Sequence, residues 1–232
     1  MVKIDKPVLL ISFPRTGSTW LHSYIEEFNN NNFGHRFVSP PSFLRSSVKE
    51  ANIHGDIKTF NSSEEKFNFL EYERTNGREY SLKHPYLKIV DKDWFREFYK
   101  NYFKIKLVRK NIWACFLSNS FFERFNHRFS KFYYVPRFEI DPTEIDKFLT
   151  KVNRFNDCDL NDTLWYYEDL SPKKLRTIFD LNREENSELQ IESQRRYYLK
   201  VISNYEYIKK LFKEKAQDKI LNPDLRSCLE FL

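Results

Sequence analysis

Glycine is scarce in this sequence, with only 4 among 232 residues. Cysteine is rarer still: the 3 cysteines, Cys115, Cys158 and Cys228, stand far apart and lack the spacing of a metal site. An odd and sparse set of this kind is typical of reduced thiols, which argues against a small secreted domain held by disulfides. We therefore expect a cytoplasm-like compartment and no structural metal.

Long apolar runs are also missing. No stretch approaches the roughly 20 residues that a helix needs to cross a bilayer. The apolar stretch before Pro14 and Arg15 is too short for a signal peptide, so we interpret it as the first strand. The expected location is the cytoplasm, without a membrane partner.

The sequence is rich in basic residues. A net charge of +6 favours anionic ligands such as nucleotides, sulfated or phosphorylated sugars, or nucleic acid. A merely soluble surface explains the charge equally well. The length and the 41% hydrophobic content are those of one globular domain, so we expect residues 1–232 to form a single domain.

Strand and helix patterns alternate along the chain. Residues 8–13 are almost all apolar, as in a strand covered on both faces, and Leu21, Tyr24, Ile25 and Phe28 then recur with helical spacing. Asn-rich 29–32 and Pro-rich 39–42 are interpreted as loops. Further strands are predicted at 79–84, 103–108 and 163–168, and further helices at 94–102, 111–122, 141–152, from 171 and from 205. The alternation predicts an α/β fold, with a mainly parallel central sheet flanked by helices.

Residues 14–21, PRTGSTWL, connect the first strand to the first helix. The leading N–H groups of a helix lack intrahelical partners and the helix dipole adds positive polarity, so such a turn favours phosphate-like anions. Gly17 lets the backbone approach an anion, Ser18 and Thr19 add hydroxyl donors, and Arg15 adds a permanent positive charge. An ordinary strand–turn–helix without a ligand is the alternative.

A nucleoside-triphosphate loop would have the pattern G-x-x-x-x-G-K-[ST]. With the second glycine placed on Gly17, Ser12 stands at the first glycine and Ser18 at the lysine. Only Gly17 and Thr19 then match. Walker-type ATP hydrolysis is disfavoured, and a small-molecule or nucleotide kinase with a degenerate loop is kept as an alternative.

The stretch resembles the 5′-phosphosulfate loop of sulfotransferases that use 3′-phosphoadenosine 5′-phosphosulfate (PAPS), of the form Pro-Lys/Arg-Ser/Thr-Gly-Thr/Ser-Thr-Trp-Leu. Residues 14–21 match that form across eight positions. The resemblance implies a P-loop NTPase-like fold, with PAPS as co-substrate and adenosine 3′,5′-bisphosphate (PAP) as product. It implies that Arg15 replaces the usual lysine against the departing phosphate, that Thr16 through Thr19 wrap the phosphosulfate, and that Trp20 lies against the adenine.

The same family carries a second motif, in which a strand is followed by Arg and, eight or nine residues later, by Ser. Residues 104–122 contain such a pattern, because Arg109 ends the predicted strand and Ser118 follows nine residues later. The resemblance implies that this pair grips the 3′-phosphate, with Lys110, at the eight-residue spacing, as the second choice. Without the resemblance, Arg109 and Lys110 could equally face solvent while Ser118 caps or bends the helix.

Sulfuryl transfer requires a base that removes the acceptor proton. The segment SLKHP (81–85) resembles a shortened form of the family's Lys-Thr-His segment, which implies His84 as the base and Lys83 as a contact to the sulfuryl oxygens. A strand-end histidine bonded to backbone is the structural alternative. His35 is the second candidate and Glu26 a third, while helix packing is a sufficient explanation for His22. The resemblance implies that no metal is required.

Residues 121–138 interleave basic and aromatic side chains. Such a mixture can bind single-stranded nucleic acid, shape a lid over the donor and acceptor sites, or form core with solvated basic flanks. We prefer the lid because the segment directly follows the second motif. WYYEDL (165–170) and SNYEYIKKL (203–211) also resemble family stretches and are given no chemical role. The sequence therefore predicts a PAPS-dependent sulfotransferase acting on a hydroxyl or amine of a small-molecule or carbohydrate acceptor, with a non-catalytic nucleic-acid-binding module as a further alternative.

Overall fold

The computed structural model describes residues 4–12, 15–33, 49–53, 56–77, 82–84, 100–125, 136–156, 163–181 and 199–220. Their contacts divide the chain into two compact units, each described here by itself. The first unit comprises residues 1–108 and 158–184, and the second comprises residues 109–157 and 185–232. The expectation of a single domain stays a prediction.

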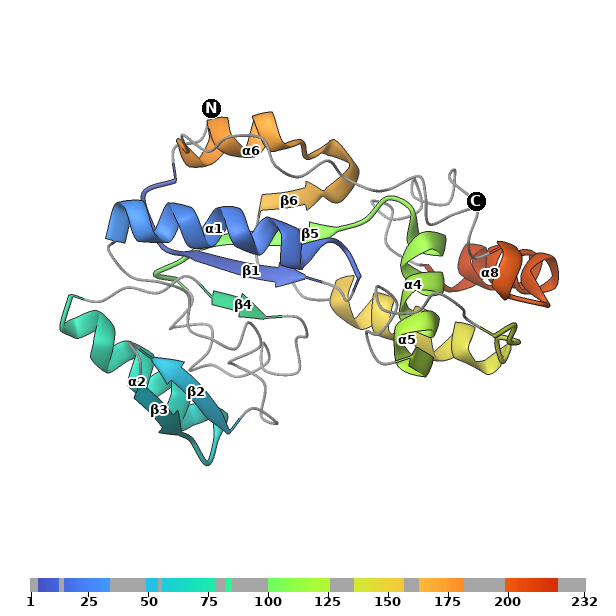
Figure 1. The fold of residues 1–232 in the computed structure, drawn as a ribbon, viewed down its shortest axis with the longest axis horizontal. Coiled ribbons are helices and arrows are strands. Elements are labelled where there is room, and N and C mark those ends of the chain that lie inside the picture. Colours follow the sequence, from blue (N-terminus) through green and yellow to red (C-terminus); the bar gives the residue numbers. More distant parts are fainter. Residues whose placement is uncertain are drawn as a thin grey trace. The chain divides into compact units, whose positions relative to one another are not determined.

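A four-stranded parallel sheet forms the centre of the first unit (Figure 1). The strands lie in the order β4 (Leu82–His84), β1 (Val8–Ser12), β5 (Phe103–Val108) and β6 (Thr163–Tyr166). Every residue of β1 is buried, as the unbroken apolar run predicts for a central strand covered on both faces. The predicted α/β class with a mainly parallel sheet is confirmed.

Two helices pack together beside this sheet. Helix α1 (Ser18–Phe33) contacts both β1 and α6 (Pro172–Phe179). The ring centroids of Phe28 and Phe179 are 5.4 Å apart, and Phe179 also packs on Trp165 of β6 at 6.0 Å. Helix α6 begins where Ser171-Pro172 predicts, because the Ser171 hydroxyl accepts the N–H of Lys174 at 3.2 Å.

Three predicted boundaries are wrong, one of them at residues 100–102, where the predicted helix 94–102 would end but the chain forms a turn and a bend. The Asn-rich stretch 29–32 is not a loop but the last part of α1, where Asn29 is fully buried and Asn32 Nδ2 donates to the Phe28 carbonyl at 2.9 Å. An asparagine that bonds to the preceding turn can remain helical. The predicted strand 163–168 ends at Tyr166, because Tyr167–Asp169 turn into a 3₁₀ helix closed by the Leu170 N–H on the Tyr167 carbonyl. Residues 13, 39–42, 79–81 and 94–99 lie outside the described residues.

A hairpin and a helix in the first unit have no counterpart in the prediction. Strands β2 (Glu50–Ile53) and β3 (Asp56–Thr59) pair antiparallel, and α2 (Ser63–Thr75) follows. The hairpin and helix meet through Phe60 and Phe69, whose ring centroids are 5.6 Å apart. All four residues of β3 are exposed. The strand therefore lacks the alternation of apolar and polar residues that predicts a half-buried strand.

The second unit is helical in its described part. Helices α4 (Ile112–Phe125), α5 (Thr143–Asn156) and α8 (Tyr205–Lys219) meet around a cluster of aromatic rings. The cluster consists of Trp113, Phe116, Phe148 and Phe212, with centroid separations of 5.0 to 6.2 Å. The Trp113 indole donates to the Tyr205 hydroxyl at 3.1 Å, so its polar atom is satisfied inside the core.

The DPTE sequence opens α5 as predicted. Asp141 Oδ1 accepts the Thr143 N–H at 2.8 Å, and Glu144 Oε1 accepts the Asp141 N–H at 3.4 Å. These reciprocal bonds form a capping box around Pro142. Among the helices described in either unit, none combines the length and apolarity needed to cross a membrane.

Candidate functional site: an anion loop at the carboxyl edge of the sheet

Strand order places the first loop at a favourable position for a ligand. The chain leaves β1 to form β4 on one side, then crosses to form β5 on the other. In open parallel sheets ligands bind at such a change of direction, outside the carboxyl ends of the strands. Register puts Ile11 beside His84 and Ser12 beside Leu107, so the three strand ends lie at one edge.

The loop after β1 has the backbone of an anion-binding turn. Arg15 and Gly17 have positive φ angles of 67° and 78°, whereas Thr16 between them does not. Alternation of this kind turns successive N–H groups toward one concave side, a form that binds anions. A non-glycine residue at positive φ is strained, and strain of this kind concentrates at functional sites.

Helix α1 starts directly from this turn. The Gly17 carbonyl accepts the N–H groups of Trp20 at 3.0 Å and Leu21 at 3.2 Å, so the amides before them stand at the positive end of the helix. The first turn of α1 contains no acidic residue that would repel an anion. Thr16 and Ser18 are buried, while Arg15 and Thr19 are exposed. The structure therefore brings the predicted residues 15–19 together on one turn.

The ring of Tyr167 lies directly against Gly17. A Cβ atom added to Gly17 would stand 2.1 Å from Tyr167 Cε2, a distance that no side chain can accept. Trp20 meets the same ring edge to face with centroids 5.8 Å apart, and Tyr24 meets Trp20 at 5.4 Å. Gly17 is thus required twice, for its positive φ and for the closeness of this ring.

Tyr167 is the residue that sequence reasoning missed. The WYYEDL stretch was interpreted only as kinship, although its Tyr167 directly follows β6 at the carboxyl edge where the loop lies. The available signal was its position, because residues after a parallel strand share that edge with the loop after β1. In the folded chain the ring of Tyr167 lies against Gly17 of the loop.

Two buried polar atoms near the loop have no hydrogen-bond partner: the Ser12 hydroxyl at the end of β1 and Trp20 Nε1. Ser12 is fully buried, and an unsatisfied buried group costs about 1–3 kcal/mol. Such atoms are candidate contacts for a bound molecule. The expectation that Trp20 lies against an adenine stays a prediction.

The second predicted motif begins at the end of the sheet and continues into the second unit. Arg109 is the residue after the last residue of β5, and both Arg109 and Lys110 are half-buried. Asn111 caps α4, because its Oδ1 accepts the Ala114 N–H at 2.8 Å. Ser118 is buried on that helix, 7% exposed. A strand end, a basic pair and a helix carrying Ser118 thus follow one another as the motif requires, and their role as a phosphate site stays a prediction.

The predicted base is placed only by its backbone. Lys83 pairs with Leu10 and His84 with Ile11, so β4 carries both to the carboxyl edge of the sheet. Their side chains and His35 lie outside the described part of the chain. Glu26, the third candidate, lies one turn from His22 on α1, with 4.0 Å between His22 Nδ1 and Glu26 Oε2.

The described ends of the basic aromatic segment belong to the second unit's packing. Phe121 is buried, and its ring packs at a tilt against Phe125 with centroids 4.7 Å apart and edge to face with Phe138 at 5.8 Å. Arg124 lies over the Phe138 ring at 4.9 Å and pairs with Glu144 at 2.6 Å. These residues support the core interpretation rather than base stacking, while residues 126–135 fall outside the described ranges.

Within the described ranges, no group of three His, Cys, Asp or Glu side chains is arranged to hold a metal ion. Comparison with protein-family models and with curated proteins gives no match to this chain. The functional assignment therefore depends on the loop motif, the second motif and the geometry described above.

Proposed function

We propose that the protein is a sulfotransferase that moves a sulfuryl group from PAPS to a hydroxyl or amine of an acceptor and releases PAP. The observation that carries the proposal is the PRTGSTWL turn: a family-like sequence with two positive φ angles at the N-terminus of α1, at the carboxyl edge of a parallel sheet. The P-loop NTPase-like character of the fold is part of the same proposal.

Each residue of the turn has a chemical role in this proposal. The amides and hydroxyls of residues 16–19 hold the 5′-phosphosulfate. The Arg15 guanidinium stabilises charge on the departing phosphate and, because it stays protonated at any working pH, does not donate the proton. His84 takes the acceptor proton, and Lys83 contacts the sulfuryl oxygens. Arg109, with Ser118 and Lys110, holds the 3′-phosphate.

The 3′-phosphate distinguishes PAPS from ordinary adenine nucleotides, so the test is a comparison of PAP with AMP. Isothermal titration calorimetry on the full chain is expected to give tighter binding of PAP. Equal affinity for PAP and AMP would overturn the proposal, and turnover of Mg-ATP would favour the kinase alternative. Steeply salt-dependent binding of an oligonucleotide without any nucleotide affinity would favour the nucleic-acid module.

The 3′-phosphate contact has its own test. Arg109→Ala is expected to weaken PAP binding by about 1.5–3 kcal/mol, the range for hydrogen bonds to charged groups, and to leave AMP binding unchanged. Arg124→Ala is the matched control, because Arg124 already pairs with Glu144 at 2.6 Å. An unchanged PAP affinity in Arg109→Ala would remove Arg109 from the site.

A further inference from the structure

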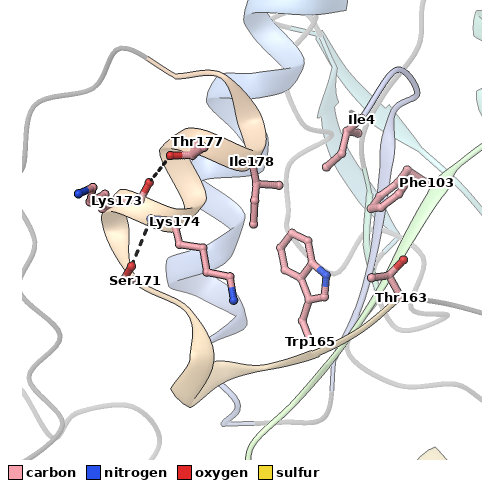
Figure 2. Close-up of a pocket in the computed structure, with 9 residues that line it drawn as sticks. All are labelled: Ile4, Phe103, Thr163, Trp165, Ser171, Lys173, Lys174, Thr177 and Ile178. Atoms are coloured by element: carbon pink, nitrogen blue, oxygen red, sulfur yellow. Dashed lines mark hydrogen bonds between the residues drawn. The ribbon is translucent and has the colours of Figure 1, made fainter. Parts of the chain in front are cut away.

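A cavity of about 510 Å³ lies in the first unit between β6 and α6, and none of its lining residues belongs to the anion loop, residues 15–19 (Figure 2). Its lining includes Phe103 and Thr163, the first residues of β5 and β6, whereas the anion loop follows the last residue of β1. The lining also reaches Trp165, which pairs with Leu107 near the last residue of β5. The volume is within the range of small-molecule sites.

The body of the cavity is apolar. Trp165 of β6 and Ile178 of α6 face one another across it in Figure 2, and Ile4 and Phe103 close it from the side of the sheet. Trp165 and Ile178 are both half-buried, so their apolar surfaces are open to the hollow. A flat apolar ring bound between them would be stabilised, because its surface and theirs would be removed from water.

The charged side chains around this apolar body are lysines. Lys174 extends toward the Trp165 indole in Figure 2, and its ammonium group donates one bond to the Asp169 carbonyl at 3.0 Å, which leaves two further N–H groups. The described residues that line the cavity include Lys174 and Lys173, the latter with its side chain directed away in Figure 2, and no carboxylate. This arrangement complements an anion and disfavours a cation.

We propose that this cavity is a second ligand site, which binds a small molecule with a flat apolar body and one anionic group, a carboxylate or a sulfonate. The apolar body lies between Trp165 and Ile178. The anionic group accepts from Lys174.

The test uses the full chain and 2-naphthalenesulfonate as the probe, followed through the indole N–H resonances of the ¹⁵N-labelled protein. The Trp165 resonance, assigned with Trp165→Phe, is expected to shift until saturation. Lys174→Glu is expected to weaken binding about ten-fold or more, the loss expected of a charged contact. Ile178→Trp, which fills the cavity, is expected to abolish the shift.

Two controls make the test specific. Lys173→Glu changes the net charge equally, but Lys173 points away from the cavity in Figure 2, so its effect is expected to stay below about three-fold. Arg15→Ala is expected to leave the affinity unchanged, which separates this cavity from the anion loop. Both glutamates would stand in the first turn of α6, where negative charge is favourable, so the helix is expected to persist.

Several results would overturn the proposal. They are an unmoved Trp165 resonance at millimolar probe, equal weakening by Lys173→Glu and Lys174→Glu, and loss of binding in Arg15→Ala. Equally tight binding of uncharged 2-naphthalenemethanol would also overturn it, because the anionic group would then contribute nothing.

Discussion

The contact between Gly17 and Tyr167 can be tested by adding a single methyl group. Gly17→Ala places a Cβ atom 2.1 Å from Tyr167 Cε2, where ordinary contact begins at 3.4 Å, so the ring or the loop must retreat by 1.3 Å. Overpacking of this kind costs about 1–3 kcal/mol. The positive φ of 78° costs a further ~1–2 kcal/mol once the residue is no longer glycine. We therefore expect Gly17→Ala to lower the free energy of unfolding by about 2–5 kcal/mol.

The chain contains a matched control for the backbone part of this cost. Gly77 has a nearly identical φ of 77°, but a Cβ atom there would meet nothing within 4 Å. Gly77→Ala is therefore expected to cost only the ~1–2 kcal/mol of backbone strain. Both glycines belong to the first unit, so urea denaturation compares the same unfolding event. The difference between the two variants isolates the contact with Tyr167.

The same variants can be combined with the removal of the ring. In a Tyr167→Ala background the methyl group at position 17 has room, so the cost of Gly17→Ala is expected to fall to that of Gly77→Ala. Equal losses in Gly17→Ala and Gly77→Ala, in the otherwise unchanged protein, would refute the close approach of Tyr167. Separately, titration of the folded Gly17→Ala protein with PAP would test whether displacement of the loop also weakens binding at the proposed donor site.

Two further predictions concern stability. Hydrogen bonds from Lys215 at 2.6 Å and Lys219 at 2.7 Å lower the pKa of Asp146, so its contribution is present above the ordinary pKa of 3.8 and is lost as pH falls through the lowered value. Asp146 is partly exposed, so Asp146→Asn is expected to lower the free energy of unfolding by less than about 1 kcal/mol at neutral pH. This loss should vanish in acid and shrink in high salt. A loss that does not depend on pH would contradict the pairing. Ser171→Ala removes the cap on the Lys174 N–H and is expected to cost about 1 kcal/mol by urea denaturation, while Ser171→Gly should cost only a few tenths; equal losses would indicate that the hydroxyl does not cap α6.

The parts of the fold that sequence predicted are those with an unambiguous apolar pattern. β1 is a fully buried parallel strand, β5 is a parallel strand with Ile105, Leu107 and Val108 buried, and α4 carries a regular apolar face, so their patterns point to one structure. The capping residues before α5 and α6 act through local bonds, which sequence also reveals. The exposed strand β3 has no such signal, and the buried Asn29 reverses the usual preference of asparagine for loops.

In the candidate site, too, sequence predicted some residues and missed another. The turn around Gly17 was predictable because the residues that form it are consecutive and its chemistry depends on their backbone. Tyr167 was not, because its position against Gly17 depends on how β6 adds to the sheet beside β5. A motif identifies residues that are neighbours in sequence, whereas the opposite wall of a site comes from a distant part of the chain.

The covering of position 17 by residue 167 also has a consequence for how the protein is made. The ring that closes over the turn is synthesised long after the turn itself, and it arrives only when the last strand has joined the sheet. Pairings between such distant segments form late, because a long stretch of chain must first be ordered. A nascent chain that still lacks β6 would expose the turn without its aromatic cover. The closed form of this turn, on which the proposed donor site depends, would therefore be among the last features this unit acquires during synthesis.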